Sequence, residues 1–347
     1  MNTVRESCRT ARHAGGFRAG IAAIAFATLA LSGAASGQMP APIGPEVWGG
    51  YTQNQLDAAY DQNFWDNDPP ETGVRGTALS NAVRARFGEP LRVAYGPSSF
   101  ERLDIYRTHA TGPAPIMVFI HGGAWRGGSA RGAGSAAEMF MEAGAHYVAL
   151  DFVNTLQNGG SIMEMAEQVR RAMVWVYNNA ASFDGDPNRI YVSGHSSGGH
   201  LCGVVMTTNW SDYNYANSLG PASVPQNLVK GGICYSGMYE LYPVSLSARR
   251  TYVNFTPEAI EQLSPMRHIN LLNAPIVIVH GTKESPEFMR QSRDFAAALE
   301  EAGKDVTYIV GEGYNHFELP ETMANPYGIL GRAALQLMGL EPNGANR

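Results

Sequence analysis

Short apolar runs recur along this chain and alternate with segments of helical character. The runs cover residues 115–120, 147–152, 190–193, 232–235, 276–280 and 306–310. Helical segments are expected at 161–180, 294–301 and 327–338. Apolar strands separated by helices are typical of a mostly parallel sheet that is covered on both faces. The sequence therefore predicts an α/β fold, and one large domain is favoured over two.

The region before these runs has a different character. Residues 39–90 are expected to be loop-rich with a single helical stretch at 54–64, and extended segments follow at 91–95 and 103–106. Two later segments, Thr207–Gln226 and Tyr242–Gln262, are long and polar and contain tyrosine and proline. Segments of this kind are candidates for loops or a lid over a site.

The composition excludes several classes of protein. The 347 residues are 44% hydrophobic and 16% charged, whereas disordered chains have low hydrophobicity and high charge. Three cysteines are too few to form the framework of a small disulfide scaffold. The 25 Lys and Arg against 31 Asp and Glu give a net charge of -6, so a nucleic acid is not expected as a partner.

The first 37 residues are expected to be a cleaved export signal. Four arginines precede an apolar run at 19–31, and small residues at 35–37 precede Gln38. The run is shorter than the roughly 20 residues that span a bilayer, so a membrane anchor is less favoured. Residues 38–347 would form a single periplasmic or secreted domain with 21 basic and 30 acidic residues, a net charge of -9.

Two cysteines, Cys202 and Cys234, remain in that domain. An oxidising compartment would permit a bond between them. However, Cys202 falls in an expected buried helix and Cys234 in an expected strand. Two buried free thiols are therefore the favoured interpretation.

The motif Gly194-His195-Ser196-Ser197-Gly198 lies between an expected strand and an expected helix. It matches the G-x-S-x-G pattern, which exposes a serine hydroxyl on a strained turn above a sheet. The small neighbours avoid clashes at this turn, and the N-terminus of the following helix favours developing negative charge. Ser196 is therefore the expected nucleophile.

A second motif, His121-Gly122-Gly123-Ala124-Trp125, directly follows the apolar run at 115–120. A turn without bulky side chains can aim its backbone amides at one oxygen atom. The expected oxyanion hole comprises Gly122, Gly123, Ala124 and Ser197, with the amides of Gly123 and Ala124 as the main pair. We expect His121 to fix this loop by hydrogen bonding.

A serine nucleophile needs a histidine base and a carboxylate that orients the base. Among the later histidines, His268 lies in an expected loop and His280 closes a strand, whereas His316 lies on a loop just after the strand at 306–310. His316 is therefore the expected base. The loop after residue 280 offers Glu284 and Glu287. Glu287 suits the start of a helix, so Glu284 is favoured as the acid.

From about residue 51 to residue 338 the chain resembles the kynurenine formamidase (arylformamidase) and hormone-sensitive-lipase-like esterase group of α/β-hydrolases. The blocks that carry this resemblance are Tyr51-Thr52, Leu56-Asp57, Tyr60, Tyr95-Gly96, Leu103-Asp104-Ile105-Tyr106, His121-Gly122-Gly123-Ala124-Trp125, Gly194-His195-Ser196-Ser197-Gly198-Gly199-His200-Leu201, Ser236-Gly237-Met238-Tyr239-Glu240-Leu241, Ser285-Pro286-Glu287-Phe288, Arg290-Gln291-Ser292 and Asn315-His316-Phe317. The resemblance implies a mostly parallel eight-stranded sheet with helices on both faces, a small loop-rich lid, and a triad of Ser196, Glu284 and His316. The group usually carries Asp where this chain has Glu284.

The expected activity is the hydrolysis of small carboxylic esters through an acyl-enzyme. An amidase or arylformamidase that acts on aryl amides or N-formyl-kynurenine-like substrates is the alternative, because it would use the same residues. A non-catalytic binding protein and an interfacial lipase are less favoured, since every triad role has a candidate and Thr207–Gln226 is too polar for an apolar lid. We expect Trp125, Tyr239 and His195 near the substrate. The expected partner is a small molecule, and no metal, cofactor or membrane anchor is expected.

Overall fold

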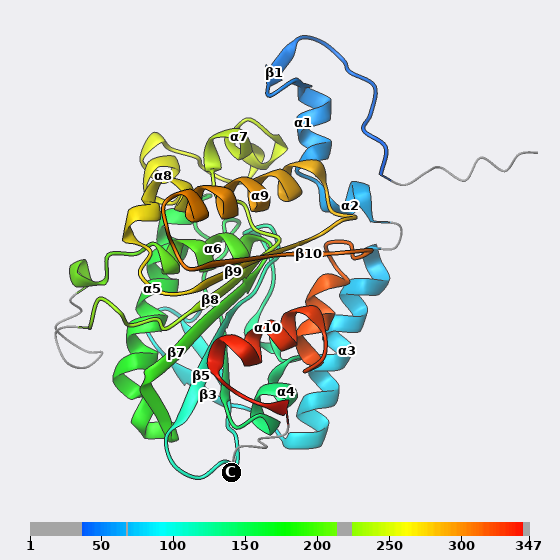
Figure 1. Cartoon of the computed structure of the whole chain (residues 1–347). Coiled ribbons are helices and arrows are strands. Elements are labelled where there is room, and N and C mark those ends of the chain that lie inside the picture. The colour runs from blue at the N-terminus through cyan, green and yellow to red at the C-terminus, as the bar shows by residue number, and fades with distance from the viewer. Residues whose placement is uncertain (1–36, 67–68, 214–223, 343–347) are drawn as a thin grey trace, which may run out of the picture. The chain divides into compact units, whose positions relative to one another are not determined.

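A single eight-stranded sheet organises the part of the chain that the computed structural model describes, residues 37–66, 69–213 and 224–342 (Figure 1). Its strand order is β10-β9-β8-β7-β5-β6-β4-β3. The strands are β3 (Leu91–Ala94), β4 (Arg102–Tyr106), β5 (Ala114–Ile120), β6 (His146–Leu150), β7 (Gly185–His195), β8 (Gly232–Tyr235), β9 (Ile276–Gly281) and β10 (Val306–Gly311). Only β4 runs antiparallel to its neighbours β3 and β6, and the other pairs are parallel. The predicted mostly parallel α/β-hydrolase sheet is confirmed.

Helices cover both faces of this sheet (Figure 1). The α-helices that follow β3 in the chain are α4 (Ala137–Glu142), α5 (Ile162–Asn179), α6 (Ser197–Met206), α7 (Leu241–Ser245), α8 (Pro257–Gln262), α9 (Pro286–Glu301) and α10 (Ile329–Met338). Short 3-10 turns are η1 (Ala130–Ala133), η2 (Ala180–Phe183), η3 (Trp210–Asp212), η4 (Ala248–Thr251), η5 (Pro265–Leu271) and η6 (Leu319–Ala324). Alternate residues of β5 divide between two cores. Ile116 and Val118 pack with α5, α6 and α9, while Met117 packs with α4 and α10.

The register of the central strands brings their carboxyl ends to one level. Ile120 of β5 pairs with Gly194 of β7, and Gly194 in turn pairs with Cys234 of β8. At the next step, Tyr235 pairs with both His195 and Val279. The loops that follow β5, β7, β8 and β9 therefore start side by side, at the edge where open α/β sheets bind their ligands.

The N-terminal region is more helical than predicted. It holds a two-stranded ribbon, β1 (Glu46–Trp48) and β2 (Tyr51–Thr52), and the helices α1 (Gln53–Ala59), α2 (Gln62–Trp65) and α3 (Pro69–Phe87). The single helix predicted at 54–64 is divided, because the Asp61 side chain accepts the amide of Asn63 and starts a new helix.

The prediction that residues 39–90 contain one helical stretch was wrong, because it missed the 19 residues of α3. The buried face of this helix carries Ser80 and Arg84 beside Val83, whereas Val74 and Leu79 are exposed. Ser80 and Arg84 donate to the carbonyls of Gly132 and Arg131. A helix that packs through polar side chains lacks the apolar periodicity by which helices are recognised in a sequence.

The two segments predicted as loops or a lid have different outcomes. Within Thr207–Gln226, residues 214–223 lie outside the described residues. The segment Tyr242–Gln262 is not a plain loop, because α7, η4 and α8 occupy most of it. Each of these short helices begins at a side-chain cap: Glu240, Ser247 and Thr256 accept the first free amides.

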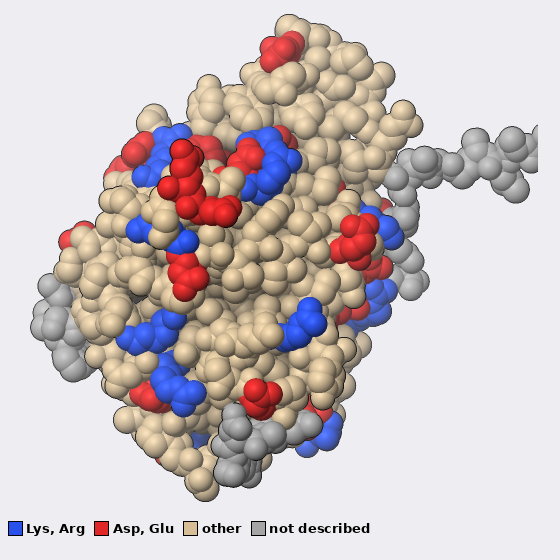
Figure 2. Space-filling view, viewed as in Figure 1, with Lys and Arg blue, Asp and Glu red and all other residues tan. Residues whose placement is uncertain are grey.

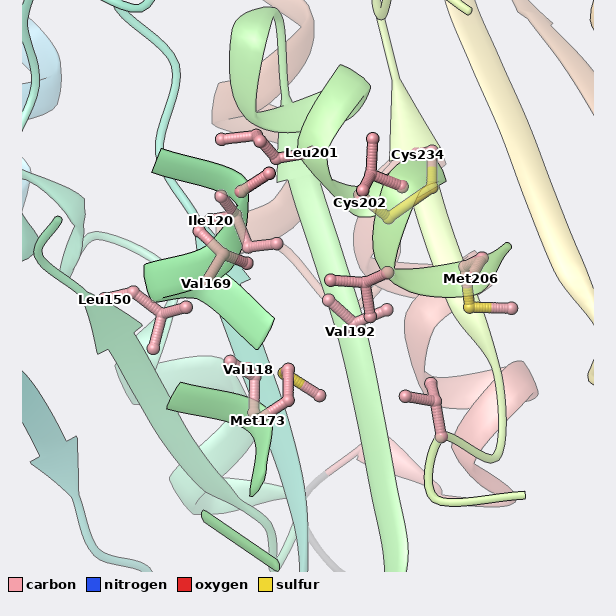
Figure 3. Packing of buried hydrophobic residues seen from close by; sticks show 14 of the residues in the cluster. Val118, Ile120, Leu150, Val169, Met173, Val192, Leu201, Cys202, Met206 and Cys234 are labelled. Atoms are coloured by element: carbon pink, nitrogen blue, oxygen red, sulfur yellow. A yellow bond between two sulfur atoms is a disulfide. The ribbon is translucent and has the colours of Figure 1, made fainter. Parts of the chain in front are cut away.

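Cys202 and Cys234 form a disulfide, with their Cα atoms 5.6 Å apart. The prediction of two free thiols was therefore wrong. Figure 3 shows the bond between α6 and β8, within the apolar packing around Leu201 and Met206. Burial does not distinguish a thiol from a disulfide. The sequence alone did not show that α6 would pack beside β8 closely enough for the two sulfur atoms to bond.

The surface is mixed in charge. On the face shown in Figure 2, basic and acidic side chains are interspersed among the described residues, and no extended basic patch is visible. Several charged side chains of the described residues form ion pairs in contact with solvent, such as Arg267 with Glu240 and Arg86 with Glu138. No helix in the described ranges is both long enough and apolar enough to cross a membrane.

Candidate active site

Ser196 lies on the turn between β7 and α6. Its backbone has φ 58° and ψ -123°, in the left-handed half of conformational space that side chains rarely adopt. The glycines on either side allow this turn to form. A Cβ on Gly194 would lie 2.1 Å from the carbonyl oxygen of Gly198, and one on Gly198 would lie 2.1 Å from that of Ile120. The local sequence thus raises the Ser196 hydroxyl above the end of the sheet.

The loop after β5 passes directly against this turn. A Cβ on Gly122 would lie 2.8 Å from the carbonyl oxygen of His195 and 2.9 Å from the Cβ of Ser196. The backbone then takes positive φ at Gly123, Ala124 and Trp125. His121 holds the loop as expected, because its Nδ1 is 2.8 Å from the carbonyl oxygen of Gly122.

The amides predicted for the oxyanion hole are available for a ligand. None of them donates to an acceptor within the described ranges. They belong to Gly122, Gly123, Ala124 and Ser197. The Ser197 amide is free because it opens α6, where the first amides have no partner within the helix. Available amides next to a serine hydroxyl can stabilise the oxyanion of a tetrahedral intermediate.

His316 reaches this serine from the loop after β10. Its Nε2 accepts the Ser196 hydroxyl at 2.9 Å, and its Nδ1 donates to Oε2 of Glu284 at 2.9 Å. The three predicted triad residues are therefore joined in one hydrogen-bonded series, although 120 residues separate Ser196 from His316. A serine polarised by an imidazole that a carboxylate orients can attack a carbonyl carbon.

Glu284 is fully buried on the loop after β9. Its Oε1 accepts hydrogen bonds from the Ser236 hydroxyl and the Gly281 amide, both at 2.7 Å. Burial raises the pKa of Glu284, and these two donors oppose that rise by stabilising the charged carboxylate.

Glu287, the alternative acid, lies in the first turn of α9. It receives the hydroxyl of Tyr60 and pairs with Arg290, each at 2.8 Å. Its carboxylate is therefore engaged by Tyr60 and Arg290, and within the described part of the chain it forms no hydrogen bond to His316.

His316 is neutral in this environment. Burial and the positive charge of Arg249 lower its pKa from the ordinary value of 6.5. A neutral imidazole can accept the serine proton, as a general base must.

His195 contacts the same loop, because its Nε2 is 2.9 Å from the carbonyl oxygen of His316 and the two rings lie 4.5 Å apart. Burial and the neighbouring His316 lower the pKa of His195 to about 3, so its Nε2–H donates to that carbonyl. His195 thereby ties the loop of the base to the turn of the nucleophile.

A cavity of about 920 Å³ opens above Ser196 and His316. Its floor includes Gly122, Gly123, Ala124 and His195, and its walls come from two segments distant in the sequence. These segments are residues 54–64 of α1 and α2 and residues 247–252 around η4. A volume of this size suits a small organic molecule.

Two residues predicted near the substrate do not line this cavity. Trp125 is 1% exposed, and its indole nitrogen donates to Nδ1 of His200 at 3.2 Å. Tyr239 is fully buried, stacks on Phe295 and donates to the carbonyl of Cys234. Both residues support the scaffold behind the site, while His195 does line the cavity.

Sequence reasoning missed three residues at this site. Ser236 holds the buried acid, and Tyr60 and Arg249 contribute to the cavity wall. A signal for Ser236 was present, because it directly follows an apolar strand, as Ser196 does. Tyr60 and Arg249 gave no such signal, because they reach the site through tertiary packing alone.

No group of three or more His, Cys, Asp or Glu side chains that could hold a metal ion is found among the described residues.

Comparisons with known proteins agree with this geometry. A family model described as BD-FAE matches residues 103–299, more than half of the chain. Kynurenine formamidase of Danio rerio is 28% identical over 311 residues, covering 84% of this chain and 98% of that protein. The esterase LipC of Mycobacterium tuberculosis is 28% identical over 247 residues, covering 67% of this chain and 60% of that protein.

A solved structure shares the fold. The acetyl ester-xyloside bifunctional hydrolase of Caldicellulosiruptor lactoaceticus superposes with a TM-score of 0.62 at 16% identity, covering 72% of this chain and 97% of that one. The predicted resemblance to the formamidase and esterase group is confirmed by these relatives. The chain belongs to the BD-FAE family and, through it, to the esterase group of the α/β-hydrolases.

Proposed function

We propose that this protein is a serine hydrolase that cleaves small carboxylic esters through an acyl-enzyme on Ser196. The observation that carries the proposal is the hydrogen-bonded series from Ser196 through His316 to Glu284, which opens onto a cavity of about 920 Å³. The esterase and hydrolase relatives support the same chemistry.

In the first half of the reaction, the Ser196 oxygen attacks the ester carbonyl carbon while its proton passes to Nε2 of His316. The carboxylate of Glu284 stabilises the resulting imidazolium. The carbonyl oxygen becomes an oxyanion, which the amides of Gly123, Ala124 and Ser197 receive. When this intermediate collapses, the carbon–oxygen bond to the leaving group breaks, and the leaving alcohol takes the proton from Nε2.

In the second half, water replaces the alcohol. His316 takes a proton from the water as its oxygen attacks the acyl carbon. The second oxyanion collapses by expelling the Ser196 oxygen, which recovers the proton from Nε2. A carboxylic acid leaves, and the enzyme returns to its starting state.

A second candidate function is hydrolysis of aryl amides or N-formyl-kynurenine-like formamides. It is favoured by the kynurenine formamidases of Danio rerio and Salmo salar, each of which aligns with 84% of this chain. The catalytic residues would be the same, and the leaving group would be an amine that takes its proton from His316.

A substrate panel tests both candidates. We expect turnover of p-nitrophenyl acetate and butyrate, which Ser196→Ala should reduce by at least about a thousandfold while leaving the circular dichroism spectrum unchanged. Turnover retained by Ser196→Ala would contradict the proposed mechanism. Efficient hydrolysis of N-formyl-kynurenine, with poor turnover of all esters, would instead favour the second candidate.

We also propose that residues 1–37 are removed on export and that residues 38–347 act as a single domain in the periplasm or outside the cell. The disulfide between Cys202 and Cys234 supports this location, because such bonds persist in oxidising compartments. After expression of the full chain in a Gram-negative host, N-terminal sequencing of the periplasmic protein should begin at Gln38. An intact Met1 terminus in the cytoplasmic fraction would contradict the proposal.

A further inference from the structure

Arg249 brings a buried positive charge to the wall of the cavity that holds Ser196 and His316. It lies in η4 and is only 9% exposed. Its guanidinium carbon lies 5.6 Å from the ring centre of Trp125 and 5.7 Å from that of Phe288. Aromatic faces stabilise a cation without neutralising its charge.

The hydrogen-bond partners of this guanidinium are neutral. One terminal nitrogen donates to the carbonyl of Tyr60 at 2.6 Å, and the other donates to the hydroxyl of Tyr252 at 3.2 Å. The buried Nε has no hydrogen-bond partner among the residues that the structure describes. Throughout the described ranges, no carboxylate forms an ion pair with Arg249. A buried cation without a counter-ion is unfavourable, so an anion that enters the cavity would be bound strongly.

The carboxylates near the cavity are already engaged or exposed. Asp57 accepts hydrogen bonds from the Gln53 side chain and the Ala248 amide. Asp61 is exposed and caps α2. Glu284 is hydrogen-bonded behind His316.

A second arginine adds positive charge at the rim. Arg126 is exposed, lines the same cavity and stacks on Tyr252 at 4.7 Å. Water screens the rim charges, whereas Arg249 is shielded from solvent. Among the charged side chains that line the cavity in the described part of the chain, Arg249 is therefore the most deeply buried.

We infer that Arg249 determines specificity by binding a carboxylate of the substrate, so the preferred substrates are small esters or amides that carry a second, ionised carboxyl group. This inference rests on the proposed hydrolase function. A single buried guanidinium matches one monoanionic group, and the planar fork of arginine suits a carboxylate. The carboxylate lies on the acyl part or on the leaving group of the substrate, and the experiment separates these two cases.

Two matched substrate pairs test the inference on the full enzyme. In the first pair, 3-carboxyphenyl acetate is compared with 3-carbamoylphenyl acetate, so the charge lies on the leaving group. In the second pair, monomethyl adipate is compared with methyl adipamate, so the charge lies on the acyl part. Each pair differs by one charge at nearly constant size. We expect kcat/KM for the carboxylate member of one pair to be about tenfold to a hundredfold higher, mainly through a lower KM, as for a hydrogen bond to a charged group.

Three variants assign this preference to Arg249. In Arg249→Met, kcat/KM should become nearly equal for the carboxylate and amide members of the preferred pair. Arg249→Lys should retain part of the preference for the carboxylate. Arg250→Met is the matched control, because Arg250 is the exposed neighbour in η4 and does not line the cavity. It should leave the ratio unchanged. Because both members of a pair are measured on the same protein, a smaller folded fraction lowers both rates and leaves the ratio intact.

The contrary results are distinct. If the wild type prefers neither carboxylate, or if Arg249→Met keeps the wild-type ratio, the inference is wrong and Arg249 only joins α1 to η4. The inference is also wrong if the wild type shows no preference and Arg249→Met lowers kcat/KM equally for both members of each pair. Turnover of the neutral esters by Ser196→Ala would instead overturn the proposed hydrolase mechanism itself, whatever the ratio.

Discussion

The hydroxyl of Ser236 donates a 2.7 Å hydrogen bond to Oε1 of Glu284, on the opposite oxygen from the one that faces His316. Ser236 follows β8 with φ 53°, so this strand also ends in a strained turn. The Ser236 amide is fixed by the carbonyl of Val279 on β9 at 2.8 Å. β8 therefore supports the acid, although no triad residue lies on it.

Replacement of this serine should weaken catalysis without unfolding the protein. In Ser236→Ala, Oε1 of Glu284 keeps only the Gly281 amide, so the pKa of Glu284 rises and the carboxylate orients His316 less firmly. A lost hydrogen bond to a charged group corresponds to roughly a tenfold lower kcat/KM. Steady-state kinetics on a neutral ester measure this. Ser182→Ala, on an exposed turn, is the control, and equal kinetics in the two variants would contradict the assigned role.

The two glutamates of the β9–α9 region should respond differently to loss of charge. Glu284→Gln removes the carboxylate that accepts Nδ1–H of His316, so kcat should fall by roughly a thousandfold to ten-thousandfold. Glu287→Gln instead weakens the half-buried pair with Arg290, so the melting temperature should fall while kcat changes little. Thermal melts and kcat measured on both variants decide the assignment. A greater loss of kcat in Glu287→Gln would reverse it.

Much of the sheet could be predicted because its strands are nearly continuous apolar runs. Buried parallel strands need apolar side chains on both faces of the sheet. Such strands therefore appear in the sequence as continuous apolar runs, without alternating polar residues. The segment at 190–193 was recognised for this reason, although β7 begins at Gly185, where polar residues extend the strand. The polar buried face of α3 shows the opposite case, in which packing through Ser80 and Arg84 left no periodic signal.

The candidate site could be predicted as far as its residues follow strand ends. Ser196, Glu284 and His316 each lie just after a strand, and parallel strands bring such loops together. The cavity walls could not be predicted in this way. Tyr60 and Arg249 are 189 residues apart and meet through a backbone carbonyl, a contact that depends on how α1 packs beside η4. Trp125 was misplaced because a positive φ turns it away from the cavity, toward His200.

The pH dependence of turnover should follow His316. Burial and the charge of Arg249 lower its pKa below 6.5, and only the neutral imidazole accepts the serine proton. The acid limb of kcat/KM for a neutral ester should therefore lie below pH 6.5. Arg249→Met removes a charge that opposes protonation, so the pKa rises and the limb moves to higher pH, while Arg249→Lys keeps it in place. Two results would contradict this electrostatic coupling: an acid limb of the wild type with its midpoint above pH 6.5, or the same midpoint in Arg249→Met and Arg249→Lys.

The disulfide should stabilise the helix that begins at the nucleophile. Cys202 lies in α6 and Cys234 in β8, so the bond joins the element after Ser196 to the strand before Ser236. The bonded residues are 32 positions apart, and closing a loop of this length in the unfolded chain stabilises the fold by about 3 to 4 kcal/mol. The double variant Cys202→Ala/Cys234→Ala should therefore melt about 5 to 10 °C lower. Its kcat at 25 °C should stay close to the wild-type value, because neither sulfur contacts the triad.

Reductant provides the control for this prediction. Dithiothreitol should lower the melting temperature of the wild type towards that of the double variant, and should leave the double variant unaffected. Peptide mapping without reduction should recover a cross-linked peptide that contains Cys202 and Cys234. Two alkylated thiols at these positions in the oxidised protein, together with equal melting temperatures for wild type and variant, would show that the bond does not form.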